Sequence, residues 1–81
     1  TKPKIYLCLP VECFGSKYAD EACLKIVRKE IRAVAKARGI EIINMYSALK
    51  GRKELFPDNL HPNAEGARIM AEKVFKKIAA Q

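Results

Sequence analysis

Five apolar residues follow one another from Ile5 to Leu9 near the start of the sequence. They do not alternate with polar residues, which is the pattern of a strand buried on both faces of a parallel sheet. Such a strand needs helices over both faces and other strands along its edges. The run therefore predicts a strand over Lys4–Pro10 in an α/β protein, with further neighbouring strands that these 81 residues do not encode.

Two longer segments carry apolar residues at helical spacing. The first begins between Ser16 and Asp20 and runs to about Arg38, where Gly39 ends it. The second begins after Asn63, a favourable helix cap. We expect the apolar stripe of each helix to lie in the core. The stripe residues are Cys23, Ile26, Val27, Ile31, Val34 and Ala35 in the first helix, and Ala67, Met70, Ala71, Val74, Phe75 and Ile78 in the second.

A second strand is expected over Gly39–Asn44, ending near Met45, and residues 46–54 are typical of a loop or short helical turn. The order of strand, helix, strand and helix is that of crossover units in a parallel α/β sheet. We expect one unit, because no repeat, linker or low-complexity tract divides the chain. No apolar run approaches the roughly 20 residues needed to span a bilayer. No targeting segment is visible, so the sequence leaves the location of the protein open.

The only histidine in the chain, His61, lies three residues after Asp58. An imidazole can accept and return a proton near neutral pH, and a carboxylate at its second ring nitrogen fixes the tautomer. The pair has the composition of two members of a hydrolytic triad. The alternative is structural, with Asp58 as a helix cap and His61 as a surface residue. Pro57 and Pro62 restrict the residues before them, which favours a shaped loop and the catalytic interpretation.

Beyond the pair itself, the stretch from Leu55 to Lys73, LFPDNLHPNAEGARIMAEK, resembles the last conserved block of the SGNH or GDSL hydrolase family. Within that family it is most similar to acyl-sugar esterases and related acetylhydrolases. The resemblance implies the C-terminal portion of a three-layer α/β/α flavodoxin-like sandwich with a parallel sheet. It implies that His61 activates the serine of a Ser-His-Asp triad and that Asp58 orients His61. The substrate implied is a short acyl ester, including esters of carbohydrate.

The other functional positions of the family lie in N-terminal blocks that this sequence lacks. These are a serine in a Gly-Asp-Ser block and an oxyanion-hole glycine and asparagine. Ser16 and Ser47 are the only serines here, and neither stands in a nucleophile turn, so we expect caps or loop residues. Residues 1–81 are therefore expected to be the C-terminal part of a single domain. The N-terminal portion of that domain is the expected partner, and the segment alone is expected to be nearly inactive.

Three residues around the pair have open roles. Asn59 and Asn63 either contact substrate or serve as turn and cap residues, and the general preference of asparagine favours the second role. Phe56 is expected to pack beneath the motif and hold Asp58 in place.

The three cysteines are Cys8, Cys13 and Cys23. They form no Cys-x-x-Cys motif, and one histidine with scattered thiols does not match the spacing of a zinc site, so we expect no metal and no cofactor. Cys8 is expected in a buried strand, Cys23 in a helix core and Cys13 in a loop. A disulfide between Cys13 and Cys23 stays open as an alternative for an exported protein.

A formal net charge of +7 raises the alternative of a small basic module that binds nucleic acid or an acidic partner. The tyrosines Tyr6, Tyr18 and Tyr46 form no interleaved aromatic platform, however, and solvated helix faces explain most of the charge. We expect no nucleic-acid partner. The basic residues assigned to these solvated faces are Arg28, Lys29, Arg32, Lys36, Lys73, Lys76 and Lys77. A non-catalytic structural fragment is the third alternative, and it is compatible with the esterase interpretation.

Overall fold

The computed structural model describes residues 3–17 and 20–80. The elements in chain order are strand β1 (Tyr6–Leu9), helix α1 (Glu21–Arg38), strand β2 (Glu41–Asn44), helix α2 (Met45–Leu49), the 3₁₀ turn η1 (Lys53–Leu55) and helix α3 (Ala64–Ala79). The predicted order of the strands and the two long helices is confirmed. Both strands are shorter than predicted, and α2 and η1 occupy the segment expected to be a loop or short helical turn. Tyr18 lies outside the described residues, as does part of the predicted start of the first helix.

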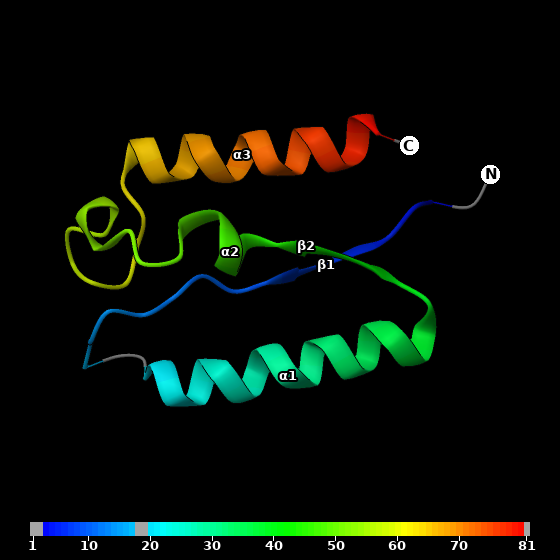
Figure 1. Ribbon diagram of the computed structural model, residues 1–81, viewed down its shortest axis with the longest axis horizontal. Coiled ribbons are helices and arrows are strands. Elements are labelled where there is room, and N and C mark those ends of the chain that lie inside the picture. Colours follow the sequence, from blue (N-terminus) through cyan, green and yellow to red (C-terminus); the bar gives the residue numbers. More distant parts are fainter. Residues whose placement is uncertain (1–2, 18–19, 81) are drawn as a thin grey trace.

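The two strands form a parallel sheet, with α1 on one face and α3 on the other (Figure 1). Tyr6 pairs with Glu41 at one end of the register and Leu9 with Asn44 at the other. The α/β fold with a parallel sheet, which the resemblance implied, is confirmed. The carboxyl ends of both strands lead to the same end of the molecule, where the loop after β1 meets the segment between α2 and α3 (Figure 1).

The helices begin and end at residues that the sequence predicted for these positions. The side chain of Asp20 accepts a hydrogen bond from the N–H of Ala22 and begins α1. Gly39, with φ 65°, ends α1 in the left-handed conformation that glycine adopts without strain. The side chain of Asn63 accepts a hydrogen bond from the N–H of Gly66 and begins α3. These short-range contacts set the direction in which α3 leaves the preceding turn.

The core lies toward the carboxyl end of the sheet. Its centre is a cluster of Leu49, Leu55 and Phe56, which join α2 to η1. Leu9 at the end of β1 is also fully buried. The half-buried residues that pack against the cluster are Val11, Phe14, Ala48, Ile69 and Met70. The core therefore includes residues on both sides of the segment between η1 and α3.

β1 is less buried than its apolar composition predicted. Leu9 is buried, whereas Ile5 is 59% exposed and Cys8 is exposed. The expectation of a strand covered on both faces is wrong for this chain. Within residues 3–17 and 20–80, β1 has a strand along one edge only and one long helix on each face.

The apolar stripes of the long helices are also covered only in part, and the expectation that they form core is wrong for most of their residues. Ala35 is buried, and Ile31, Met70 and Val74 are half-buried. The exposed stripe residues are Cys23, Ile26, Val27, Val34, Ala67, Ala71, Phe75 and Ile78. Each helix turns one face to the two strands, and the described chain offers nothing to cover the adjoining flank.

No disulfide joins the cysteines of the described chain. Cys13 is buried in the loop after β1, while Cys8 and Cys23 are exposed, which corrects the expectation that both are core residues. Within the same residues no group of His, Cys, Asp and Glu side chains could hold a metal ion. Among the helices that the structure describes, none combines the length and the apolarity that crossing a membrane requires.

Candidate active site

The segment from Asp58 to His61 lies between η1 and α3, at the carboxyl end of the sheet (Figure 1). Loops at this edge of an open α/β sheet commonly carry reactive groups, because the helices cover the two faces and leave the strand ends accessible.

Asp58 and His61 are in direct contact. Asp58 Oδ2 lies 2.6 Å from His61 Nδ1. Asp58 Oδ1 accepts hydrogen bonds from the backbone N–H groups of Leu60, at 2.9 Å, and of His61, at 2.6 Å. Both carboxylate oxygens therefore hold the imidazole or the turn that carries it. The side chains of His61 and Asp58 are 75% and 55% exposed, so a reactant can reach the ring.

These contacts set the charge state of the pair. Hydrogen bonds hold the pKa of Asp58 well below its usual range. The bond with the ring of His61 contributes most, and the backbone N–H groups of His61 and Leu60 contribute less. The carboxyl group is therefore ionised near neutral pH and can only accept hydrogen bonds. Nδ1 of His61 has to donate, which leaves the lone pair of the neutral ring on Nε2. In this state the pair can accept a proton at Nε2 and hold the resulting imidazolium beside a negative charge.

Phe56, which was expected to pack beneath the motif, is buried directly before the turn. Its side chain is 2% exposed and belongs to the core cluster. Its carbonyl accepts a hydrogen bond from the N–H of Asn59 at 2.9 Å. The turn that carries Asp58 is thus anchored to the most buried part of the molecule.

The first turn of α3 packs closely behind His61. A Cβ added at Gly66 would lie only 2.9 Å from Cβ of Pro62, which follows His61 in the chain. The N–H of Asn63 donates to the carbonyl of Leu55 at 2.7 Å. Asn63 therefore has the capping role that was one of its two predicted alternatives, and a side chain at Gly66 would disturb this packing.

Asn59 has the turn role. Its φ is 65°, in the left-handed region. Its carbonyl accepts a hydrogen bond from the N–H of Phe14 at 2.9 Å, and its amide Nδ2 donates to the carbonyl of Gly15 at 3.2 Å. The rings of Phe14 and Phe56 also pack together, with centroids 5.1 Å apart. These contacts have no sequence signal, because they join segments that lie 44 residues apart.

Arg28 does not lie on the solvated face that was predicted for the basic residues of α1, whereas Lys29, Arg32 and Lys36 are exposed. Its side chain is 8% exposed and donates to the carbonyls of Pro10, at 2.8 Å, and Val11, at 2.9 Å. It also donates to both carboxylate oxygens of Glu21, at 2.7 and 2.9 Å, and lies 3.9 Å from the ring centroid of Tyr46. The Arg28–Glu21 hydrogen bonds lower the pKa of Glu21 and raise that of Arg28. Arg28 thereby fixes the start of the loop after β1.

Ser47 is neither the cap nor the loop residue that was expected, because it lies within α2 and bonds to Asn44, the N-cap of that helix. Its N–H donates to Oδ1 of Asn44 at 2.9 Å, and its hydroxyl donates to the Asn44 carbonyl at 3.0 Å. The ammonium of Lys73 donates to the same hydroxyl at 2.6 Å. Ser16 lies half-buried in the loop after β1.

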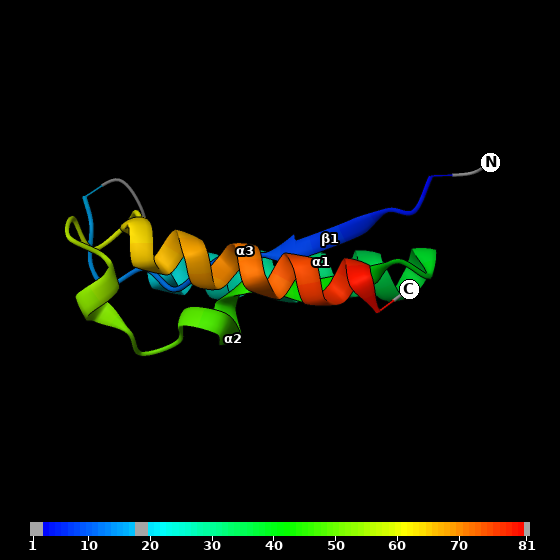
Figure 2. The ribbon, with the colours of Figure 1, turned by 90° about the horizontal axis from the view of Figure 1, so that it is seen from above.

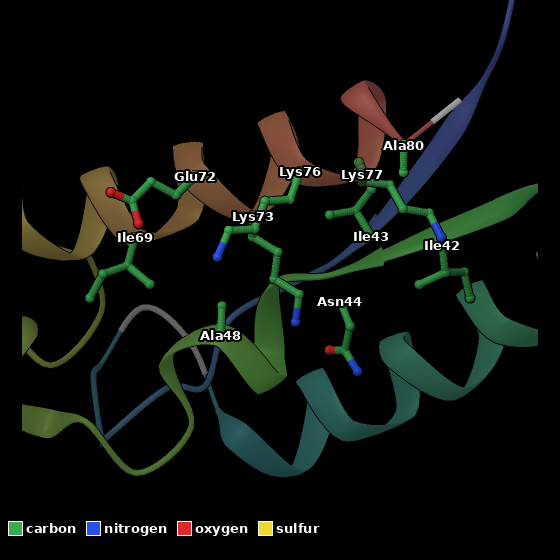
Figure 3. Close-up of a pocket in the computed structure, with 10 residues that line it drawn as sticks. All are labelled: Ile42, Ile43, Asn44, Ala48, Ile69, Glu72, Lys73, Lys76, Lys77 and Ala80. Carbon is green, nitrogen blue, oxygen red and sulfur yellow. The ribbon is translucent and has the colours of Figure 1, made fainter.

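A groove of about 590 Å³ lies between β2, α2 and α3 (Figure 3). Apolar side chains such as Ile43 and Ile69 form its floor, and Lys73 and Lys76 extend from α3 along it (Figure 3). Neither residue of the acid–base pair lines this groove.

No protein-family model matches the chain. The chain is 35% identical over 81 residues to an acetylxylan esterase of Xylanibacter ruminicola, an alignment that covers 94% of this chain and 16% of the esterase. The esterase domain of a zebrafish retrotransposon ORF1 protein matches 98% of this chain with a TM-score of 0.81 and 18% identity, over 48% of that structure. A member of the lipolytic G-D-S-L family from Veillonella parvula matches 90% of this chain with a TM-score of 0.76 and 22% identity, over 42% of that structure.

These similarities confirm the resemblance that the sequence indicated. The chain is similar in sequence to part of an acetylxylan esterase, and its fold is that of a segment of the GDSL or SGNH hydrolases. It spans 16% of the length of the curated relative and less than half of each solved structure, at 48% and 42%.

Proposed function

We propose that this chain supplies the base and the acid of a Ser-His-Asp triad in a carboxylic-ester hydrolase of the GDSL type. His61 is the base, and Asp58 orients it. The serine and the oxyanion donors come from the N-terminal portion of the same domain. The observation that carries the proposal is the 2.6 Å contact between Asp58 Oδ2 and His61 Nδ1, at the carboxyl end of the sheet in a homologue of an esterase.

In this mechanism Nε2 of His61 removes the proton from the serine hydroxyl as the serine oxygen attacks the ester carbonyl. The imidazolium gives that proton to the departing alcohol oxygen, and an acyl-enzyme remains. His61 then takes a proton from the water that attacks the acyl-enzyme and returns it to the serine oxygen, which releases the carboxylic acid. Asp58 stays ionised throughout, in agreement with the lowered pKa of its carboxyl group.

The carbonyl oxygen gains negative charge during each attack and needs fixed hydrogen-bond donors. The functional blocks that carry such donors in the family have no counterpart in residues 1–81. The chain alone is therefore expected to be nearly inactive, and its partner is the N-terminal portion of the domain.

One side of the described chain fits such a partner. The groove beside β2 is lined by Ile69, Glu72 and Lys76 of α3. Residues of a helix follow one another at about 100°, so Ala71 and Ile78 lie on the opposite flank of α3. In Figure 2, β1 and α2 lie on opposite sides of α3, which places this second flank on the side of β1. Ile78 is 52% exposed there.

Helix α1 has the same asymmetry. Its Lys25 and Arg32 line a groove together with Tyr46 of α2. The opposite flank, toward β1, carries Val27 and Val34, which are 43% and 50% exposed. The open edge of β1 thus lies between two exposed apolar helix flanks. An open strand edge pairs readily with another strand, and contiguous apolar surface is typical of an interface. These features support a partner that adds a strand beside β1 and covers both flanks.

Short acyl esters of carbohydrate are the proposed substrates. The support is the acetylxylan esterase to which the chain is 35% identical. Acetylated xylo-oligosaccharides and p-nitrophenyl acetate, offered in parallel, separate a carbohydrate esterase from one that requires only the acetyl group. A higher kcat/KM for the carbohydrate ester is expected, and equal values would contradict this part of the proposal.

Reconstitution tests the function. The chain is mixed with the N-terminal portion of its parent domain, and the hydrolysis of p-nitrophenyl acetate is followed. Activity is expected only in the mixture. His61→Ala should lower the rate by about 10²–10⁴-fold, the usual contribution of a general acid–base group. The fold should persist, because the His61 side chain is 75% exposed.

Lys53→Ala is the matched control, because Lys53 is exposed in η1 shortly before the pair. It should leave the rate unchanged. Equal rates for His61→Ala and Lys53→Ala in mixtures with the same circular dichroism would contradict the proposed role of His61. Binding to DNA or RNA that weakens steeply with salt, in the absence of esterase activity, would favour the basic-module alternative instead.

A further inference from the structure

We infer that Asn59 is a positioning residue for the acid–base pair: its left-handed backbone and its side-chain amide hold the Asp58–His61 turn against the loop after β1, residues 10–17, which Arg28 in turn holds in place. The catalytic meaning of this inference rests on the proposed function. The contacts on which it is built do not depend on any activity.

The pair cannot be held in place by packing of its own side chains. Those of Asp58 and His61 are 55% and 75% exposed. A catalytic pair has to keep its geometry within roughly 0.5 Å, which requires support from the surrounding structure. The support must therefore come from the backbone of the turn and from whatever anchors that backbone.

The backbone of the turn depends on the conformation of Asn59. At φ 65°, Asn59 adopts a region that most residues avoid and that asparagine tolerates. Its own N–H donates to the carbonyl of Phe56 at 2.9 Å. The next two N–H groups, of Leu60 and His61, both donate to Oδ1 of Asp58. A residue that prefers helical or extended backbone at this position would open the turn and remove these donors from the carboxylate.

Asn59 also forms hydrogen bonds with the loop after β1. Its carbonyl accepts the N–H of Phe14 at 2.9 Å, and its amide donates to the carbonyl of Gly15 at 3.2 Å. The side chain thus binds the loop through its nitrogen. The ring contact between Phe14 and Phe56 holds the same two segments together from the core side.

The loop is itself fixed along its length. Arg28 donates to the carbonyls of Pro10 and Val11 at the start of the loop. Glu21, the partner of Arg28, accepts the N–H of Cys13 at 2.8 Å. A buried guanidinium with several charge-assisted hydrogen bonds is a rigid support. The result is a continuous set of contacts from α1 through the loop to the turn that carries the pair.

Two substitutions separate the backbone role from the amide role. Asn59→Ala removes the amide and disfavours the left-handed backbone, while Asn59→Gly removes only the amide. The readouts are the NMR pH titration of the Asp58 carboxyl carbon and the exchange protection of the His61 Nδ1 proton. We expect the pKa of Asp58 to rise toward its ordinary value in Asn59→Ala and to rise less in Asn59→Gly. Protection of the ring proton should fall in the same order.

Ile31→Ala is the control for general destabilisation, since Ile31 is half-buried in α1 and lies outside these contacts. It should lower stability without moving the Asp58 titration. In the reconstituted domain, Asn59→Ala should lower kcat and leave KM unchanged. An unchanged Asp58 titration in Asn59→Ala, or a raised KM with kcat intact, would overturn the inference. The titrations need no activity, so a failed reconstitution with these shifts present would refute the proposed function and not the positioning role.

Discussion

Replacing Gly66 by alanine tests how closely α3 packs behind the acid–base pair. The new Cβ would lie 2.9 Å from Cβ of Pro62 and 3.6 Å from Cδ1 of Leu49. The Pro62 side chain cannot rotate away, because its ring is bonded to its own backbone nitrogen. Helix propensity favours alanine by about 1 kcal/mol, whereas overpacking a tight site costs typically about 1–3 kcal/mol. The contact is shorter than Cβ atoms tolerate, so we expect a net loss of about 1 kcal/mol in the free energy of unfolding.

Urea denaturation followed by circular dichroism measures this loss, and the slope of the transition should not change. For a chain of this size the same loss lowers Tm by roughly 4–8 °C. Ala67→Gly is the matched control, because Ala67 is exposed in the same helical turn and reports the local helix propensity without the steric contact. Stabilisation by Gly66→Ala, equal in size to the destabilisation by Ala67→Gly, would refute the close approach to Pro62.

Arg28→Met should lower the free energy of unfolding by about 2 kcal/mol, because it leaves a partly exposed carboxylate and two carbonyls without their donor; an unchanged urea midpoint would count against the buried network. The pKa of Asp58 is lowered in the folded state, so its contribution to stability is present above the unfolded pKa and is lost as pH falls through the folded pKa. The difference in urea midpoint between the wild type and His61→Ala should therefore shrink between about pH 5 and pH 2, and a constant difference would exclude this linkage. Val34→Asp and Ile78→Asp should each weaken association with the N-terminal portion by about tenfold or more without lowering the stability of the chain, since both side chains lie exposed beside β1. A titration of reconstituted activity measures that affinity, and wild-type affinity in both variants would argue against the proposed interface.

The contact between Asp58 and His61 and the helix ends could be predicted from the sequence because they depend on local geometry. Asp58 reaches His61 across a single turn, and Asn63 reaches the N–H of Gly66 in the same way. Gly39 ends α1 through its own backbone freedom. Residue type and spacing largely determine such contacts, whereas the order of strands and helices followed from the apolar pattern.

The support of the pair could not be predicted, because it joins segments far apart in the chain. The contact between Asn59 and Gly15 spans 44 residues and is accepted by a backbone carbonyl, which carries no sequence signal. Arg28 was assigned to a solvated face because the sequence shows its charge. The sequence does not show that its guanidinium donates to two backbone carbonyls in the fold. The prediction that the apolar stripes of the helices are buried failed for a different reason. Periodicity indicates which side of a helix is apolar, but it does not indicate whether another segment covers that side, and Val34 and Ile78 are exposed in the described chain.

The protonation of the two ring nitrogens of His61 decides whether the pair can act as proposed. In a ¹⁵N-labelled chain, at a pH where the ring is neutral, the two nitrogen shifts identify the protonated atom. The contact with Asp58 predicts a proton on Nδ1 and a bare Nε2, ready to accept a proton from a serine. A proton found on Nε2, with Nδ1 bare, would contradict the assignment of His61 and Asp58 as base and orienting acid.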